Sequence, residues 1–406
     1  MNMKKEISLG DLFRRKPKTD GSTSPALASG DAKTSFLKKE ITLPGIGGAS
    51  IPKRLVGLKL GASQIAAAEI VNNGAPELVQ VVRTALEPGV IVAGELRDPE
   101  ALSASLAEFF KASKLPRRGV RLGVASNRIG VRAFDLVGVD DPKQLTNAIR
   151  FRAQEVLPIP LNEAVLDYQV LGETVGEGGE RTHRVLLVVA YRELVDRYVR
   201  ACTDAGIQLA GIDLEAFALL RALAAPRVSS ADESEPAAAR VAVSIGHDRS
   251  TLAVSDGRIC EFTRVIEWGG GALDVALARV LDVAPSEAEP IKRSLSVVGD
   301  DVPEGLTEES ARKAREAIRR EVQSFAREVV SSLTFYQSQA ASLGIADIAL
   351  TGGTAHLNGL AEELQRLVGV TVRPGDPFAR VRVNKSMAVD EQLGSLTVAI
   401  GLGIED

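Results

Sequence analysis

The sequence predicts an α/β protein whose two related domains face one cleft. Its 406 residues exceed what one ordinary hydrophobic core holds. Two similar segments, each an apolar strand, a glycine turn and a second strand, begin at Val56 and Val241, one in each half of the chain. A unit repeated at this spacing indicates two related domains. Paired turns of this kind present backbone N–H groups to one nucleotide from two sides.

The composition is that of an ordinary soluble protein and excludes several function classes. Apolar residues make up 45% and charged residues 25% of the chain. A net charge of −4 and only 4% aromatic residues argue against a nucleic-acid partner. Cys202 and Cys260 are too few for a disulfide framework, so we expect buried thiols in a reducing compartment. With no secretory signal or spanning stretch, we expect a cytoplasmic protein.

Residues 1–53 have the composition of a disordered tail. The segment is rich in Gly, Ser, Thr and Pro, and its Lys and Arg outnumber its acids. Ile7, Leu9, Leu12 and Phe13 precede a basic run that starts at Arg14. This part has three interpretations: a docking peptide, a helix on a membrane surface, or a solvated tail.

Residues 54–225 form the predicted first domain. Asn-Gly at Asn73 predicts a hairpin between its early strands. Asp98 is expected to cap a helix with Pro99 at its first position, and a second helix begins at Asp140 or Asp141. Further strands are expected at 120–125, 129–136, 167–171 and 185–190, followed by a helix that stops at Gly206 and a strand–helix pair at 212–223.

Residues 226–238 read as a linker because Pro, Ser, Asp and Glu dominate them. The predicted second domain, 239–406, contains a helical pattern over 308–343, in which we expect a bend or a break. After a strand at 345–350 comes a third glycine turn, which starts at Thr351 and precedes a helix. Exposed N–H groups at such a turn suit a phosphate or an adenosine.

Other chemistries lack their motifs. The sequence contains neither a P-loop nor a nucleophile elbow. His183, His247 and His356 have no ligand-type spacing, so we predict no metal site and assign no catalytic residue. A single glycine turn is weak evidence of function, but three in this order at domain spacing are stronger together.

The order of the three turns resembles the actin-like ATPase superfamily, which includes Hsp70 chaperones, sugar kinases and the division protein FtsA. Within it the chain is most similar to the PilM family of type IV pilus assembly, over about residues 54–406. The residues that carry the resemblance are 57–69, 88–91, 98–102, 155–161, 166–170, Ala288, Glu289, Lys292, 332–339 and 350–353.

The resemblance implies an actin-like (ribonuclease H-like) two-domain fold with an FtsA/PilM-type inserted subdomain at about 127–178. It implies a small subdomain at about 285–325 in the second domain, and a segment from about 385 that packs back on the first domain. In PilM-like proteins ATP lies between the domains. A groove in the first domain takes the N-terminal cytoplasmic tail of PilN, an inner-membrane protein. PilM-like proteins thereby connect PilN with other pilus assembly components.

The same resemblance implies a set of nucleotide-binding residues. Glu289 and Lys292 lie where the family contacts the ribose, although an i,i+3 surface ion pair explains them equally well. The complete predicted set is Lys59, Gly61, Ala62, Ser63, Gly246, His247, Glu289, Lys292, Gly352, Gly353 and Thr354.

Two departures from the family bear on catalysis. Lys59 and Ser244 stand where the family has the aspartates that organise Mg²⁺ and its water. Their replacement argues against Mg²⁺ and against efficient hydrolysis, while ATP binding remains a prediction. Lys59 either neutralises a phosphate directly or forms a salt bridge in an empty cleft.

Three functions follow from these observations. The first is an adaptor at the inner membrane face that binds a PilN-like tail and is gated by ATP. The second is an active ATPase or small-molecule kinase of the same fold. The third is an FtsA-like scaffold that contacts the membrane through its basic N-terminal tail.

Overall fold

The computed structural model describes residues 53–139, 141–156, 159–175, 179–223, 238–257, 259–339, 342–384 and 393–405. The predicted tail, apart from Lys53, and nearly all of the predicted linker lie outside these residues. Within them, no helix has the length and apolar character needed to cross a membrane.

A six-stranded sheet forms the centre of domain I, with strand order β10-β6-β1-β2-β3-β16. β1 runs antiparallel to β2, β2 antiparallel to β3, and β1 parallel to β6. Gly74, with φ 86°, connects β2 and β3, as the Asn-Gly signal predicted. The strands are β1 (Arg54–Leu60), β2 (Gln64–Asn73), β3 (Ala75–Ala85), β6 (Arg118–Val124), β10 (Gln208–Leu214) and β16 (Arg382–Val383).

Helices cover both faces of this sheet because its strands alternate their side chains. Ile65 and Ala67 belong to the core that includes Phe110 of α2, whereas Ala66 and Ala68 pack in a second cluster with α10. The short strands β4 and β5 form a hairpin before α2. These elements are β4 (Ile91–Val92), β5 (Glu95–Leu96), α2 (Pro99–Ser113), α4 (Arg192–Asp204), α5 (Glu215–Leu223) and α10 (Thr397–Gly403).

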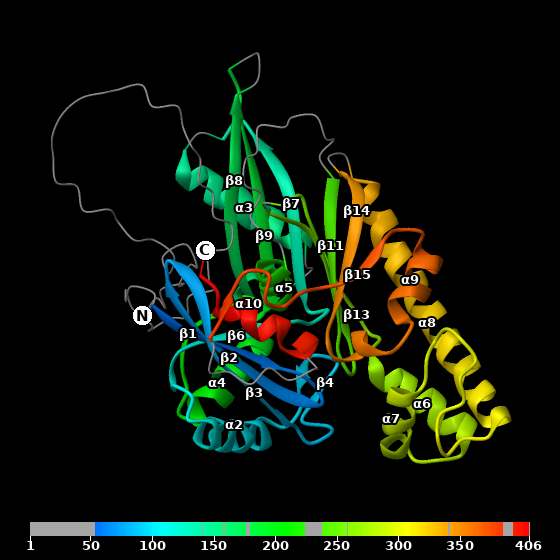
Figure 1. Ribbon diagram of the computed structural model, residues 1–406. Coiled ribbons are helices and arrows are strands. Elements are labelled where there is room, and N and C mark those ends of the chain that lie inside the picture. Colours follow the sequence, from blue (N-terminus) through cyan, green and yellow to red (C-terminus); the bar gives the residue numbers. More distant parts are fainter. Residues whose placement is uncertain are drawn as a thin grey trace.

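Domain II repeats the topology of domain I. Its sheet has the order β13-β12-β11-β14-β15, with a three-stranded antiparallel meander followed by two parallel strands. The two sheets lie side by side in Figure 1. The predicted repeat is therefore one topology used twice. The strands are β11 (Ala238–Ile245), β12 (Ser250–Ser255), β13 (Cys260–Ile266), β14 (Gly344–Thr351) and β15 (Val372–Pro374).

An inserted lobe projects from domain I (Figure 1). It is a three-stranded antiparallel sheet, β7-β9-β8, with α3 packed against it. We placed its end at about 178, whereas the central strand of the sheet continues to Tyr191. Position 178 falls between Val175 and Arg181, which are paired residues of β8 and β9 in this one sheet. The elements are β7 (Ile129–Val137), α3 (Pro142–Val156), η2 (Leu161–Glu163), β8 (Ala164–Val175) and β9 (Arg181–Tyr191).

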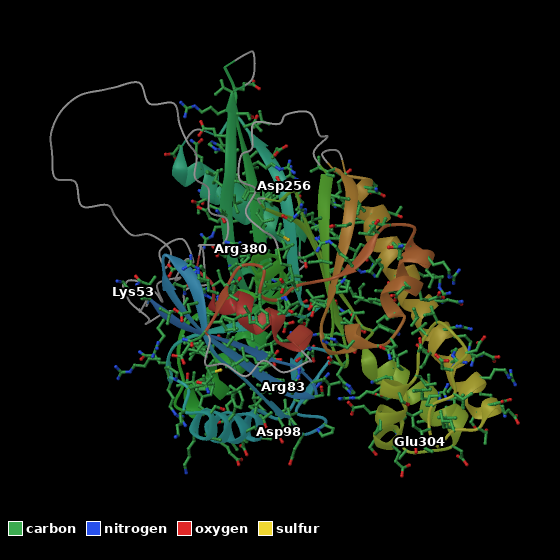
Figure 2. All side chains as sticks on the ribbon, viewed as in Figure 1. Lys53, Arg83, Asp98, Asp256, Glu304 and Arg380 are labelled. Carbon is green, nitrogen blue, oxygen red and sulfur yellow. The ribbon has the colours of Figure 1, made fainter. Side chains whose placement is uncertain are left out.

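A helical lobe extends from domain II, with Glu304 at its lower end in Figure 2. α8 is one continuous helix, so of the bend or break that we expected in this pattern, the break is wrong. Buried residues recur along the whole length of α8, and Trp268 stacks on Phe325 at 4.4 Å. Both halves of the helix therefore pack on domain II, and no break between them is required. The elements are α6 (Gly270–Leu281), α7 (Pro285–Ser294), α8 (Glu308–Gln337), η3 (Gly353–His356), α9 (Leu360–Val368) and η4 (Leu393–Leu396).

The end of the chain packs into domain I through α10. Arg121 donates to Leu402 O at 2.9 Å and to Ile404 O at 2.8 Å, and Arg221 donates to Gly401 O at 2.8 Å. A Cβ built on Gly401 would lie 1.8 Å from Ala218 O of α5. α10 and α5 therefore touch backbone to backbone.

We predict that Gly401→Ala destabilises the protein despite the better helix propensity of alanine. The methyl group has no space against α5, and overpacking of this kind costs about 2–3 kcal/mol. Urea unfolding should show a lower midpoint. Gly344→Ala is the matched control, because its added Cβ meets no atom within 4 Å. Equal midpoints for the two variants would contradict the packing argument.

Candidate functional site

The second and third glycine turns are joined in one structure. Gly246 O accepts hydrogen bonds from Gly270 N and from Thr354 Oγ1, both at 2.9 Å. His247 O accepts from Gly271 N at 2.7 Å. The turn between β11 and β12 is thereby fixed to the start of α6 and to the third turn.

Glycine is required at the third turn. Gly352 has φ 96°, and a Cβ there would lie 2.3 Å from Ile245 O. Its N–H donates to Gly394 O at 3.1 Å, so this turn also contacts the segment that enters domain I. Gly353 begins η3, and Thr354 is nearly buried.

Lys292 and Glu289 form ion pairs with other residues and not with each other. Lys292 Nζ lies 2.6 Å from Asp274 Oδ1 and donates to Gly270 O at 3.3 Å. Glu289 pairs with Arg293 at 2.6 Å. The i,i+3 pair that we considered is therefore not the arrangement found.

Several charges act on the Glu289 carboxyl. The hydrogen bond from Arg293 lowers its pKa, partial burial opposes this, and the nearby charges of Lys292 and His247 lower it further. The predicted residues of domain II therefore lie close together around the joined turns: Gly246, His247, Glu289, Lys292, Gly352, Gly353 and Thr354.

The first glycine turn belongs to domain I. Lys59 is half-buried in β1, opposite Ala66 of β2 and Gly123 of β6. Gly61 N donates to Gln64 O, and Ser63 O accepts from Leu86 N, both at 2.9 Å. These contacts of Gly61 and Ser63 stay within domain I, and a role of Gly61, Ala62 and Ser63 toward a nucleotide remains a prediction.

The positions that would organise Mg²⁺ do not fit that ion. Lys59 contributes a cation, and Ser244 is a buried hydroxyl between β12 and β14. Mg²⁺ prefers carboxylate and phosphate oxygens in octahedral geometry. Across the described residues, no three His, Cys, Asp or Glu side chains come together as a metal site.

Sequence reasoning missed two residues in the second turn. Arg249 is 6% exposed, and its Nη2 lies 3.6 Å from Oε1 of Glu215, which begins α5 in domain I. The Asp248 carboxylate accepts a hydrogen bond from Ala93 N at 2.8 Å. The only sequence signal was two adjacent charges in a turn where small residues are usual.

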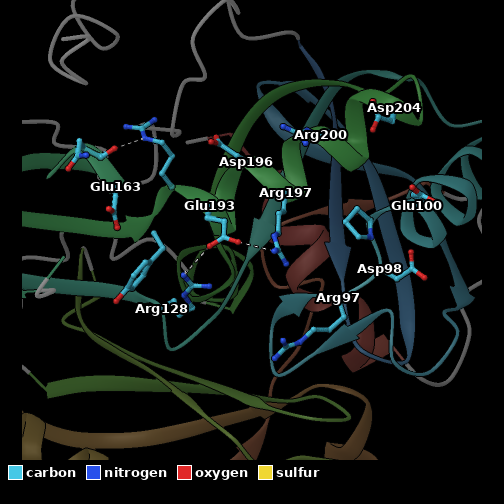
Figure 3. Close-up of a pocket in the computed structure, with 14 residues that line it drawn as sticks. Arg97, Asp98, Glu100, Arg128, Glu163, Glu193, Asp196, Arg197, Arg200 and Asp204 are labelled. Carbon is cyan, nitrogen blue, oxygen red and sulfur yellow. Dashed lines mark hydrogen bonds and ion pairs between the residues drawn. The ribbon is translucent and has the colours of Figure 1, made fainter. Parts of the chain in front are cut away.

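A charged groove of about 1050 Å³ lies between the inserted lobe and the body of domain I (Figure 3). The end of the β4–β5 hairpin, the start of α2, η2 and the exposed side of α4 line it. Its charged lining residues are Arg97, Asp98, Glu100, Arg128, Glu163, Arg192, Glu193, Asp196, Arg197, Arg200 and Asp204.

Ion pairs hold part of this lining in place. The Arg128 guanidinium lies 4.2 Å from the centre of the Tyr191 ring and 3.8 Å from Glu193. Glu193 also pairs with Arg197 at 2.8 Å, as the dashed lines of Figure 3 show. Asp196, Arg200 and Asp204 follow at four-residue spacing along the exposed side of α4, a stripe that a helical reading of the sequence reveals.

The chain is similar to known proteins in both sequence and structure. The family model described as type IV pilus assembly protein PilM matches residues 57–406. A solved structure titled PilM-PilN type IV pilus biogenesis complex superposes with a TM-score of 0.72 at 25% identity. It covers 87% of this chain and 98% of that chain.

The chain is also similar to curated members of the actin-like superfamily. Cell division protein FtsA of Escherichia coli K12 is 27% identical over 264 residues, which is 59% of this chain and 60% of the relative. FtsA of Pseudomonas aeruginosa is 24% identical over 364 residues, 80% of this chain and 84% of the relative. The chain thus spans about 60% of the length of the first relatives. The expected actin-like two-domain fold is confirmed.

We predict that Arg293→Gln raises the pKa of Glu289 toward its ordinary value of 4.5, because it removes the main group that lowers it. Stability from this pair is present above that value and is lost as the pH falls through the lowered pKa. Both side chains are half exposed, so the contribution is small. Carbon-detected NMR titration measures the shift. Lys313→Gln, which removes the partner of Glu309, should leave Glu289 unchanged.

Proposed function

The chain belongs to the family of type IV pilus assembly protein PilM, and from this premise we propose that it is an adaptor that binds an extended protein tail in the charged groove. The occupant is the N-terminal cytoplasmic tail of a PilN-like inner-membrane protein. Such binding holds the adaptor at the cytoplasmic face of the inner membrane, where it contacts other pilus assembly components.

The groove is the observation that carries this proposal. Its volume of about 1050 Å³ is at or above the upper end for small-molecule pockets, roughly 300–1,000 Å³. Most of its lining residues are acids or arginines, whereas small-molecule pockets are lined mainly by hydrophobic and aromatic side chains. An extended peptide offers backbone donors and acceptors along its length, which suits a long polar lining.

Charged groups of both signs at fixed positions also favour one direction and register of the occupant. Arg192 is fixed by hydrogen bonds to Asn162 O at 3.2 Å and Ala164 O at 2.8 Å. Arg197 donates to Leu96 O at 3.2 Å. Because these groups are held before binding, they lose little conformational entropy when a peptide arrives.

A nucleotide in the interdomain cleft is the second part of the proposal. The joined turns at Gly246 and Thr354, with Lys292 beside them, favour it. Lys59 would supply positive charge toward a phosphate where the family uses acids and a metal. ATP would then set the angle between the domains without being hydrolysed, by population shift.

The other two candidate functions have weaker support. An active ATPase lacks both metal-organising acids at Lys59 and Ser244. An FtsA-like membrane scaffold depends on the N-terminal basic segment, which lies outside the described residues. Vesicle sedimentation with anionic lipid and nucleotide separates this scaffold from the adaptor.

We predict that Arg200→Glu weakens binding of a tail peptide by about fivefold or more, because the exposed charge faces the groove and is reversed. The probe is a fluorescent synthetic peptide with the first residues of the PilN-like protein from the same organism, followed by anisotropy. Arg279→Glu on α6 is the matched control, since Arg279 is exposed and lies in domain II. Equal peptide affinity of the two variants would show that the tail does not bind in this groove.

We predict that fluorescent ATP binds with the same affinity in Mg²⁺ and in EDTA, and that no Mg²⁺-dependent phosphate release accompanies it. Lys59→Asp should weaken binding in EDTA and make the remaining affinity depend on Mg²⁺. Binding that requires Mg²⁺ in the unmodified protein contradicts a role for Lys59. Absent binding leaves the peptide groove as the functional site.

A further inference from the structure

The β4–β5 hairpin touches both candidate sites. Its tip contacts the second glycine turn of domain II through Ala93 and Asp248. Its far end contributes Arg97 and Asp98 to the charged groove. Only a few residues separate the two ends, so a displacement of one reaches the other through the backbone of the hairpin.

Domain II contributes two adjacent residues to the contact at the tip. The Asp248 carboxylate accepts from Ala93 N at 2.8 Å. Arg249 enters domain I beside Gly94, where an added Cβ would lie 3.1 Å from Arg249 Nη1. There Arg249 meets the buried carboxylate of Glu215 at 3.6 Å. The contact therefore joins three separate segments: the turn, the hairpin and the start of α5.

Helix α4 supports the hairpin from beneath and also lines the groove. Tyr198 Oη donates to Gly94 O at 3.1 Å, and Arg197 Nη1 donates to Leu96 O at 3.2 Å. Arg197 also pairs with Glu193 and lines the groove. Helix α4 therefore contributes Arg197 to both the hairpin and the groove.

The buried charges at this contact are incompletely satisfied. Arg249 Nη1 and Glu215 Oε1 are both buried without a hydrogen-bond partner. Both atoms lie in ion pairs, Arg249 Nη1 at 3.7 Å from Asp248 and Glu215 Oε1 at 3.6 Å from Arg249. Buried charges that lack hydrogen bonds stabilise a contact less than fully bonded ones do, so less binding energy is needed to open it.

We propose that Asp248 and Arg249 form a latch between the domains, and that this latch couples the interdomain angle to occupancy of the charged groove through the β4–β5 hairpin. A closed latch holds the tip of the hairpin and fixes the groove wall at Arg97 and Asp98. An open latch releases that wall. The coupling to a peptide rests on the proposed function, whereas the coupling between the two ends of the hairpin does not.

Hydrogen exchange at single amides tests the latch without any ligand. Ala93 N reports the tip, and Arg97 N, which donates to Val90 O at 2.8 Å, reports the groove end. In Asp248→Ala, exchange at Ala93 should rise by about tenfold, since a bond to a charged acceptor is lost. Exchange at Arg97 should rise by about fivefold, in the range typical of coupled sites.

Three further variants make the experiment decisive. Asp248→Asn keeps an acceptor oxygen and should retain protection at both amides. Arg249→Met should release both amides, whereas Arg279→Met, on an exposed part of α6, should release neither. Faster exchange at Ala93 with no change at Arg97 overturns the coupling. Unchanged exchange at both amides overturns the latch itself.

The tail peptide adds a reciprocal measurement. Because linkage is symmetric, peptide binding should slow exchange at Ala93, and Asp248→Ala should lower peptide affinity by a factor equal to that coupling, about fivefold. Equal affinity in the two proteins overturns regulation of the groove. If the peptide binds neither protein, the proposed function fails, and exchange at Arg97 still decides the latch.

Discussion

The capping of the last helix by two buried arginines is the interaction on which the rest of the structure depends. Arg121 from β6 and Arg221 from α5 satisfy the carbonyls of Gly401, Leu402 and Ile404, which a short helix leaves unpaired at its end. Arg221 is itself neutralised by Asp213 at 2.7 Å. Gly394 of η4, which leads directly into this helix, accepts a hydrogen bond from Gly352 N of the third glycine turn, so the anchor of domain I also positions a turn of domain II.

Domain I and domain II consequently share apolar packing rather than facing one another across water. Every residue from Glu215 to Ala222 of α5 is buried, and α5 contacts α10 on one side and the domain II sheet on the other. Ala242, Ala253 and Cys260 of that sheet belong to the main core of domain I. Asp248 and Arg249 add polar contacts to this apolar interface, since Arg249 pairs with Glu215 at the start of α5 and Asp248 accepts from Ala93 N.

The sequence was sufficient for features that depend on local chemistry or on repetition. The Asn-Gly hairpin, the Asp98 cap, which accepts from Ala101 N, and the repeated strand–turn–strand unit each follow from residues adjacent in the chain. The limit of the inserted lobe and the continuity of α8 were misjudged because strand pairing and lateral packing decide them. Asp274, Glu215 and Arg249 were not found because their partners are distant in sequence, and no spacing rule brings such residues together.

Two features of this chain bear on how its domains are held together: metal-organising acids are absent at Lys59 and Ser244, and the second turn carries the charges of Asp248 and Arg249. In an enzyme of this fold, nucleotide and metal would hold the two domains together from inside the cleft. Here Lys59 and Ser244 give a metal no carboxylate, while Asp248 and Arg249 reach domain I directly. Protein side chains thereby supply an interdomain attraction that a metal–phosphate complex would otherwise provide. Under the proposed function and the proposed latch, contacts on the β4–β5 hairpin would govern the interdomain angle in place of a metal–nucleotide complex, which is the property that an adaptor needs.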